Sequence, residues 1–181
     1  MPSAPPATAA TAIGANGLLV SVGIYYHDVG KMLKPQFFVE NQPGGRNPHD
    51  KLKPHTSAAI VREHVTEGER MAKEEGVPDV VTQFIPEHHG TGMTLAFYRM
   101  AVAAAADNGD EVRQEDFRYP GPKPQSRETA ITMLADTCEA RVRSAEPESS
   151  EEIHRIVGEM IKLRLESGQL DESDLTLRDM K

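Results

Sequence analysis

Apolar residues recur at intervals of three and four along most of this chain, and this helical spacing constrains the fold more than any other feature. Residues 56–75 show it most clearly, because one apolar stripe runs through the segment and stops at a glycine. Similar patterns predict helices at residues 16–30, 78–89, 95–106, 127–144 and 149–167. Residues 32–55 are rich in Pro, Gly and Asn and predict an irregular connection, with a short extended piece at 36–40. The sequence therefore predicts an all-α helical bundle with irregular loops.

Length and charge narrow the class of protein. A chain of 181 residues suits one domain with a sizeable core. Its formal charge of −8, from 20 Lys and Arg against 28 Asp and Glu, argues against binding to a nucleic-acid polymer and favours a small ligand. Cys138 has no second cysteine to pair with, and no apolar run approaches the roughly 20 residues that a membrane helix needs. We therefore expect a cytoplasmic protein whose chain makes no membrane contact itself.

The first twelve residues, MPSAPPATAATA, differ in composition from the rest of the chain. They lack the basic start and the continuous apolar stretch of a secretory signal. We expect residues 1–12 to be a disordered or truncated edge and residues 13–181 to form the domain.

Six side chains of metal-binding types lie on or beside the apolar faces. They are His27, Asp28, His64, His88, His89 and Asp136. Unpaired polar groups are costly in such positions, so these side chains need partners. A metal centre would satisfy them, because imidazoles and carboxylates suit iron, manganese or zinc and because one carboxylate can bridge two ions.

Each of these residues also has an ordinary structural explanation. A single buried histidine such as His64 is more often a hydrogen-bonded core residue, and Asp136 could cap a helix or pair with an arginine. His88 and His89 could complement the dipole at a helix C-terminus. Six such coincidences in a chain with only seven histidines are harder to accept, and together the residues favour a metal centre. Lys31 is either a solvated charge or a group that reaches a phosphate.

The order of these residues resembles a known superfamily. A His-Asp pair, a lone histidine in a helix, a His-His pair before a glycine and a later aspartate in "LADTCEA" are similar to the HD-domain metal-dependent phosphohydrolases. The chain resembles one branch more closely, the cytoplasmic HD domain of the seven-transmembrane HD receptors, which are the PgpH-type cyclic di-AMP phosphodiesterases. This closer similarity lies in the segments "YYHDVGKM", "FFVENQ", "NPHDKL", "EHHGT", "FRYPGPKPQSRETAI", "MLADTCEARVRS" and "GQLDESDLTLRDM". The matching segments run from about Ile13 to Met180, which is nearly the whole chain.

The resemblance implies an all-helical domain with a two-metal centre that hydrolyses cyclic di-AMP to the linear dinucleotide pApA. The ions would be iron or manganese, with zinc or nickel as alternatives, and Asp28 would bridge them. Two-metal chemistry implies that a water between the ions becomes hydroxide near neutral pH and attacks phosphorus in line. Lys31 would neutralise charge on the phosphate. The resemblance also implies nucleotide contacts from Asn41, Arg118 and Lys123. The ligands would be His27, Asp28, His64, His88, His89 and Asp136.

One feature of the family is absent before His27. The family has a further histidine ligand in an upstream helix, whereas no histidine precedes His27 in this chain. We expect a truncated chain, a misread start or a divergence, with incomplete occupancy by the ion that uses His27, Asp28 and Asp136. Two other functions stay open, an HD phosphohydrolase of another nucleotide and a catalytically impaired nucleotide-binding or signalling module. The family also implies a full-length protein anchored at the cytoplasmic face of a membrane, and a homodimer stays open.

Overall fold

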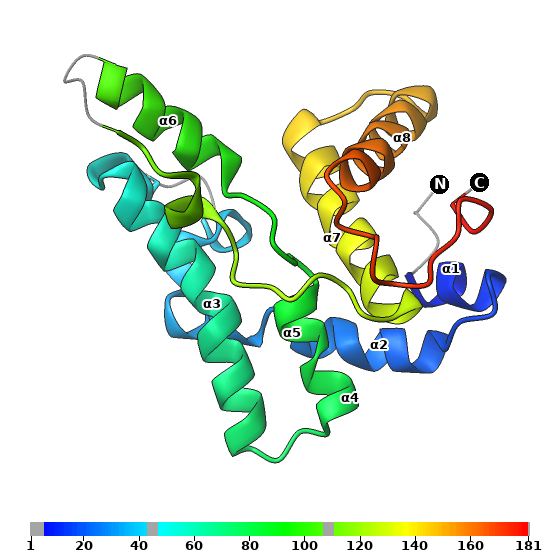
Figure 1. Ribbon diagram of the computed structural model, residues 1–181. Helices are drawn as coiled ribbons and strands as arrows, with labels where there is room; N and C mark the ends of the chain where they lie inside the picture. The colour runs from blue at the N-terminus through cyan, green and yellow to red at the C-terminus, as the bar shows by residue number, and fades with distance from the viewer. Residues whose placement is uncertain (1–5, 43–46, 107–110, 181) are drawn as a thin grey trace.

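Eight α-helices and five short 3-10 helices make up the described part of the chain, residues 6–42, 47–106 and 111–180 of the computed structural model (Figure 1). The α-helices are α1 (Pro6–Ala12), α2 (Gly17–Tyr26), α3 (Pro54–Glu74), α4 (Asp79–Thr82), α5 (Phe84–Glu87), α6 (Leu95–Ala106), α7 (Arg127–Ala145) and α8 (Ser150–Glu166). The 3-10 helices are η1 (Val29–Leu33), η2 (Pro35–Phe37), η3 (Val39–Asn41), η4 (Pro48–Lys51) and η5 (Gln114–Phe117). An isolated bridge between Met93 and Arg118 is the one β-type pairing found in these ranges, so the predicted all-α class is confirmed.

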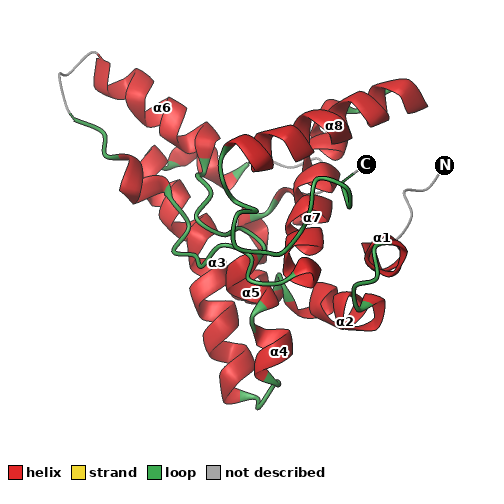
Figure 2. Cartoon of the chain, turned by 45° about the vertical axis from the view of Figure 1, so that its right-hand side comes forward, coloured by secondary structure: helices red, strands yellow, loops and turns green. Residues whose placement is uncertain are grey.

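The helices form two arms that meet at α5 (Figures 1 and 2). One arm pairs α3 with α6, and the other pairs α7 with α8. Helix α5 packs against both α3 and α7, while α2 packs against α5 and α7. Side chains at the end of α5 therefore lie where the two arms and the end of α2 meet. Throughout the described ranges, each helix is too short or too polar to cross a membrane.

The core follows the same arrangement. Ala10, Val20, Phe84 and Ile131 form one buried cluster that joins α1, α2, α5 and α7. A second cluster joins α3, α6 and η5, and a third packs the C-terminal segment against α7. Burial of these side chains, rather than helix propensity alone, holds the short helices in place.

The expected disordered edge is partly helical. Residues 6–12 form α1, and the side chain of Ala10 is fully buried against α2, α5 and α7. The expected disorder is therefore wrong for residues 6–12, because the alanine-rich face of α1 removes apolar surface from water. Residues 1–5 lie outside the described residues.

The long predicted helices are found as α3, α6, α7 and α8. Serine side chains cap two of them, since Ser126 accepts a hydrogen bond from the backbone of Thr129 and Ser149 from that of Glu152. Helix α7 thus starts at a fixed residue, which sets the rotational position of Asp136 three turns later.

Three segments differ from the prediction. The helix expected at 16–30 ends at Tyr26 and continues as a turn and η1. The helix expected at 78–89 is divided at Gln83 into α4 and α5. The extended piece expected at 36–40 is wrong, because these residues form η2 and η3. Their backbone N–H groups bond to carbonyls three residues earlier instead of to a neighbouring strand.

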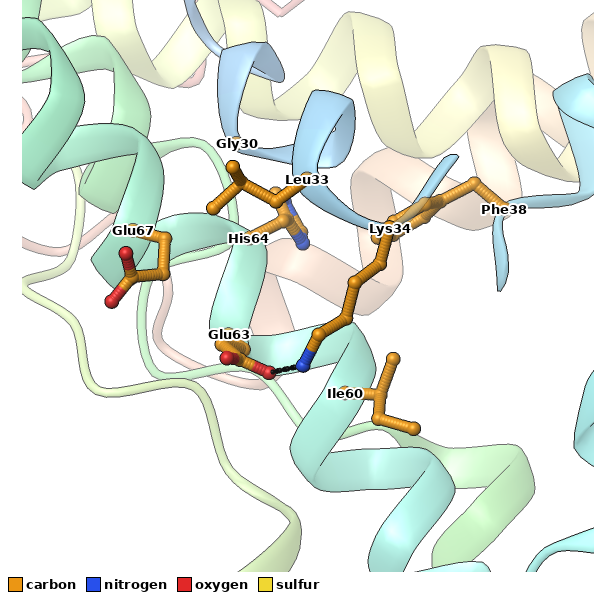
Figure 3. A pocket seen from close by; sticks show the side chains of 8 residues that line it. All are labelled: Gly30, Leu33, Lys34, Phe38, Ile60, Glu63, His64 and Glu67. Carbon is orange, nitrogen blue, oxygen red and sulfur yellow. Dashed lines mark hydrogen bonds and ion pairs between the residues drawn. The ribbon is translucent and has the colours of Figure 1, made fainter. Parts of the chain in front are cut away.

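Gly30 brings η1 into direct contact with α3. A Cβ atom on Gly30 would overlap the carbonyl oxygen of His64 and would lie 2.7 Å from the backbone nitrogen of Gly68. Figure 3 shows Gly30 and Leu33 over α3 at His64, beside a shallow hollow closed by an ion pair between Lys34 and Glu63. Only a glycine allows this approach of two backbones.

We expect Gly30→Ala to lower the free energy of unfolding by about 1–3 kcal/mol, because the added methyl group forces the backbone of η1 away from α3. Urea unfolding followed by circular dichroism measures the change. Gly158→Ala is the matched control, since a Cβ on Gly158 meets nothing within 4 Å. An equal effect of both substitutions would contradict the packing argument.

Candidate metal centre

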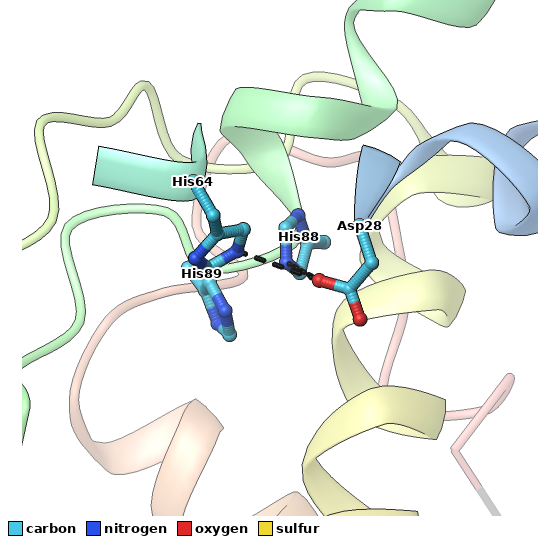
Figure 4. A group of neighbouring side chains, drawn as sticks. All are labelled: Asp28, His64, His88 and His89. Carbon is cyan, nitrogen blue, oxygen red and sulfur yellow. Dashed lines mark ion pairs between the residues drawn. The ribbon is translucent and has the colours of Figure 1, made fainter. Parts of the chain in front are cut away.

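Asp28 lies in the turn between α2 and η1, and its carboxylate points toward a cluster of histidines (Figure 4). Its Oδ1 atom is 3.4 Å from His64 Nε2 and 3.5 Å from His88 Nε2. Its Oδ2 atom is 3.2 Å from His27 Nε2 and 2.6 Å from Lys31 Nζ. The two oxygens of one carboxylate therefore face different sets of partners.

The six predicted ligands form two groups that share Asp28. In the first group, atoms of Asp28, His64, His88 and His89 lie within 4.8 Å of one another. In the second group, atoms of Asp28, His27 and Asp136 lie equally close together. Asp136 also links the groups, because its Oδ2 atom is 3.9 Å from His89 Nδ1. Residues from α2, α3, α5 and α7 are thus brought to one place.

Three of the histidine rings are oriented by the backbone in the same way. In each ring, Nδ1 donates a hydrogen bond to the carbonyl three residues earlier, because a carbonyl oxygen can only accept. These pairs are His27 with Ile24 at 2.7 Å, His64 with Val61, and His88 with Ile85 at 2.7 Å. The neutral ring then carries its lone pair on Nε2, which faces Asp28. Metal-ligating histidines are held by such hydrogen bonds from the other ring nitrogen.

Three buried polar atoms in the cluster have no hydrogen-bond partner among the described residues. They are Asp28 Oδ1, His64 Nε2 and His88 Nε2. Burial without a partner costs free energy, so three such atoms facing one point indicate a missing partner. Imidazole nitrogens and a carboxylate oxygen are donors that divalent transition metals accept. The residues present therefore fit a bound divalent cation.

The protonation states also suit a cation. Burial lowers the pKa of His64 to about 4, helped by the neighbouring charge of His88, and burial lowers the pKa of His89 well below its usual value. Burial alone would raise the pKa of Asp28, but the imidazoles of His27 and His88 beside its carboxylate lower it overall. Near neutral pH, His64 and His89 thus present lone pairs and Asp28 a carboxylate.

Lys31 lies at the edge of this cluster. Its ammonium group contacts Asp28 Oδ2 at 2.6 Å and Glu40 Oε1 at 2.7 Å, and it lies 5.1 Å from the centroid of the Phe38 ring. Burial alone would lower the pKa of Lys31, but the charge of Asp28 raises it overall. Lys31 is therefore charged and held in place. The sequence pattern did not reveal its second partner, Glu40, because that residue lies on η3.

The three predicted nucleotide contacts lie around the cluster rather than within it. Asn41 is exposed on η3. Arg118 donates to the carbonyl of Thr91 at 3.2 Å, two residues after the second histidine of the pair. The ammonium group of Lys123 lies 3.8 and 3.9 Å from carboxylates of residues 171–172. Nucleotide binding by these residues stays a prediction.

Tyr119 borders the site and was not predicted. Its ring stacks on the imidazole of His89, with centroids 4.1 Å apart and an angle of 22° between the planes. Its backbone N–H donates to the carbonyl of Gly92 at 2.8 Å, which fixes the loop against the histidine pair. Burial raises the pKa of the Tyr119 hydroxyl, which is thus protonated at neutral pH. In the sequence, its only signal was its place beside Arg118.

Glu87 is a second residue that the sequence analysis missed. This buried carboxylate accepts a hydrogen bond from Thr129 Oγ1 at 2.6 Å and from the backbone of Gln125 at 2.8 Å. Burial raises the pKa of Glu87. The two bonds tie the end of α5 to the start of α7 and so set His88 relative to Asp136. A glutamate on an otherwise apolar helix face was the signal available for it.

Comparison with known proteins gives close relatives. The chain is similar to the cyclic-di-AMP phosphodiesterase PgpH of Bacillus subtilis, with 45% identity over 172 residues that cover 95% of this chain and 24% of that protein. It thus spans less than a quarter of the length of the curated relatives it matches. The crystal structure of the PgpH HD domain of L. monocytogenes superposes with a TM-score of 0.89 and 41% identity, over 97% of this chain and 80% of that one. The same domain in complex with cyclic di-AMP gives a TM-score of 0.90 and 42% identity, with the same coverage.

The family match agrees with the geometry. A family profile described as "HD domain" matches residues 7–141, which is more than half of the chain. The match begins inside α1, before the expected boundary at residue 13, and it includes all six residues of the cluster. The chain therefore belongs to the HD-domain family.

Proposed function

We propose that this chain is a metal-dependent phosphodiesterase domain that hydrolyses cyclic di-AMP to pApA. The observation that carries the proposal is the sharing of Asp28 between two groups of metal-binding side chains. A pair of divalent ions held by one carboxylate suits hydrolysis of a phosphodiester, because charge develops on both the entering and the leaving oxygen. The similarity to PgpH HD domains, one of them in complex with cyclic di-AMP, supports this substrate.

The two groups suggest which residues hold each ion. His64, His88, His89 and Asp28 would hold one ion, and His27, Asp136 and the same Asp28 would hold the other. Nitrogen and carboxylate donors favour iron or manganese, with zinc or nickel as alternatives. When bound, the ions supply Lewis acidity and lower the pKa of water to near neutrality.

The chain's own residues contribute position and charge. The carbonyl groups behind His27, His64 and His88 hold these rings with Nε2 facing Asp28. Lys31 is charged and already oriented by Asp28 and Glu40, so it can neutralise phosphate without reorganisation.

One feature of the cluster favours a second function, nucleotide binding without hydrolysis. The group of His27, Asp28 and Asp136 offers three ligands, whereas the other group offers four. Weak binding of the ion at the three-ligand group would leave a domain that binds the nucleotide without hydrolysing it. We further propose that a longer protein containing this chain lies at the cytoplasmic face of a membrane and forms a homodimer.

We expect His88→Ala to reduce hydrolysis of cyclic di-AMP by at least about 100-fold and to lower the amount of bound metal, because it removes a ligand from the centre. Product formation with added manganese and a metal count on the purified protein are the measurements. The control is His154→Ala, since His154 is exposed on α8. Full activity of the His88 variant would rule out this metal centre. Metal and nucleotide binding by the parent without product would support the binding module instead.

We expect Lys31→Met to lower kcat roughly 100-fold, because the substitution removes the positive charge that neutralises the phosphate. The metal content stays at the parent level, because the metal ligands are unchanged. Steady-state kinetics and a metal count test this. Lys34→Met on the same segment is the control, because Lys34 pairs with Glu63 at the surface. Loss of metal from the Lys31 variant would show that the lysine only positions Asp28.

A further inference from the structure

Arg164 reaches from α8 across to α7 and the turn after the histidine pair. Its Nε and Nη2 atoms donate to Thr137 Oγ1 at 3.0 and 2.9 Å. Its Nη1 atom lies 3.2 Å from the place that a Cβ on Gly92 would take. Two nitrogens bonded to one hydroxyl fix the plane of the guanidinium, while Nη1 has no hydrogen-bond partner in the described ranges.

This guanidinium has no carboxylate within ion-pair distance among the residues that the structure describes. Burial lowers the pKa of Arg164, although the charge of Asp136 acts in the opposite direction. By contrast, the exposed Arg155 on the same helix pairs with Glu159 at 2.7 Å and with Glu152 at 3.5 Å. A partly buried cation without a paired anion costs free energy, so the position of Arg164 calls for an anionic partner.

The neighbours of Arg164 place it beside the metal centre. Thr137 follows Asp136 in α7, and Gly92 lies three residues after His89. Asp136 and His89 approach each other to 3.9 Å, and Tyr119 stacks on that imidazole. Lys31, in contrast, is engaged with Asp28 and Glu40. Arg164 is therefore a cation on the Asp136 side of the cluster.

A cyclic dinucleotide presents two phosphate groups, and a single lysine already bound to two carboxylates leaves charge to be neutralised. Arginine suits this task because its rigid fork of donors matches phosphate oxygens. We infer that Arg164 binds a phosphate group of the nucleotide beside His89 and Asp136. This inference rests on the proposed function, since it concerns the substrate of the same site.

The test uses Arg164→Met, which keeps the apolar stem and removes the charge, and Arg164→Lys, which keeps the charge and removes the fork. Arg155→Met is the control on the exposed face of α8. Five quantities are measured for each manganese-loaded protein: KM and kcat for cyclic di-AMP, the Kd of inorganic phosphate by calorimetry, the bound metal, and Tm.

We expect Arg164→Met to raise both KM and the Kd of phosphate roughly 10- to 100-fold, with bound metal and Tm equal to those of the control. Arg164→Lys recovers part of the phosphate binding. Unchanged KM and phosphate Kd in Arg164→Met would overturn the inference. So would a loss of phosphate binding that occurs only together with lost metal and lowered Tm in both variants, because Arg164 would then be a structural link between α7 and α8.

The phosphate arm separates this inference from the proposed function. If the parent protein binds phosphate through Arg164 but does not hydrolyse cyclic di-AMP, the anion site is supported and the proposed function is contradicted. If the parent hydrolyses cyclic di-AMP and Arg164→Met has the same KM and phosphate Kd as the parent, the anion site is contradicted while the proposed function stands.

Discussion

The backbone contact between Gly30 and α3 is the constraint on which the rest of the site depends. Because Gly30 has no side chain, η1 comes close enough to α3 for Asp28 to reach His64. Any larger residue would hold the two segments apart and separate the carboxylate from the histidine of the neighbouring helix. The second constraint is the buried bond between Glu87 and Thr129, which ties the end of α5 to α7. Backbone packing and one buried carboxylate thus bring ligands together from four helices.

The cluster contains an electrostatic conflict that the fold only partly resolves. Hydrogen bonds to backbone carbonyls satisfy one nitrogen of His64 and of His88, yet the other nitrogen of each ring and Asp28 Oδ1 stay without partners among the described residues. Buried atoms of this kind destabilise a folded chain unless a cation binds them. Binding free energy for a metal therefore contributes to folding free energy as well. Stability and function depend on the same atoms.

Charge is distributed unevenly in this acidic chain. The net charge of −8 would repel a nucleotide, but the residues around the cluster include Lys31 and Arg164, both partly buried. Buried cations are screened less by salt than exposed ones, so under the proposed function they would attract phosphate although the chain as a whole is negative. Tyr119 adds an aromatic wall beside His89, which restricts access to the ligands from that side. Local arrangement, rather than net charge, therefore determines which anion can approach.

The sequence by itself determined the long helices and the candidate ligands. Apolar spacing predicts a residue's neighbours within one helix, so the pattern around His64 was enough to put this residue on a buried face. Spacing carries no information across helices. The sharing of Asp28 by two ligand groups, the pairing of Lys31 with Glu40 and the position of Arg164 beside the Asp136 side of the cluster were therefore decided only by the tertiary structure. The physical reason is that these contacts depend on how backbones of distant segments pack, which no local pattern records.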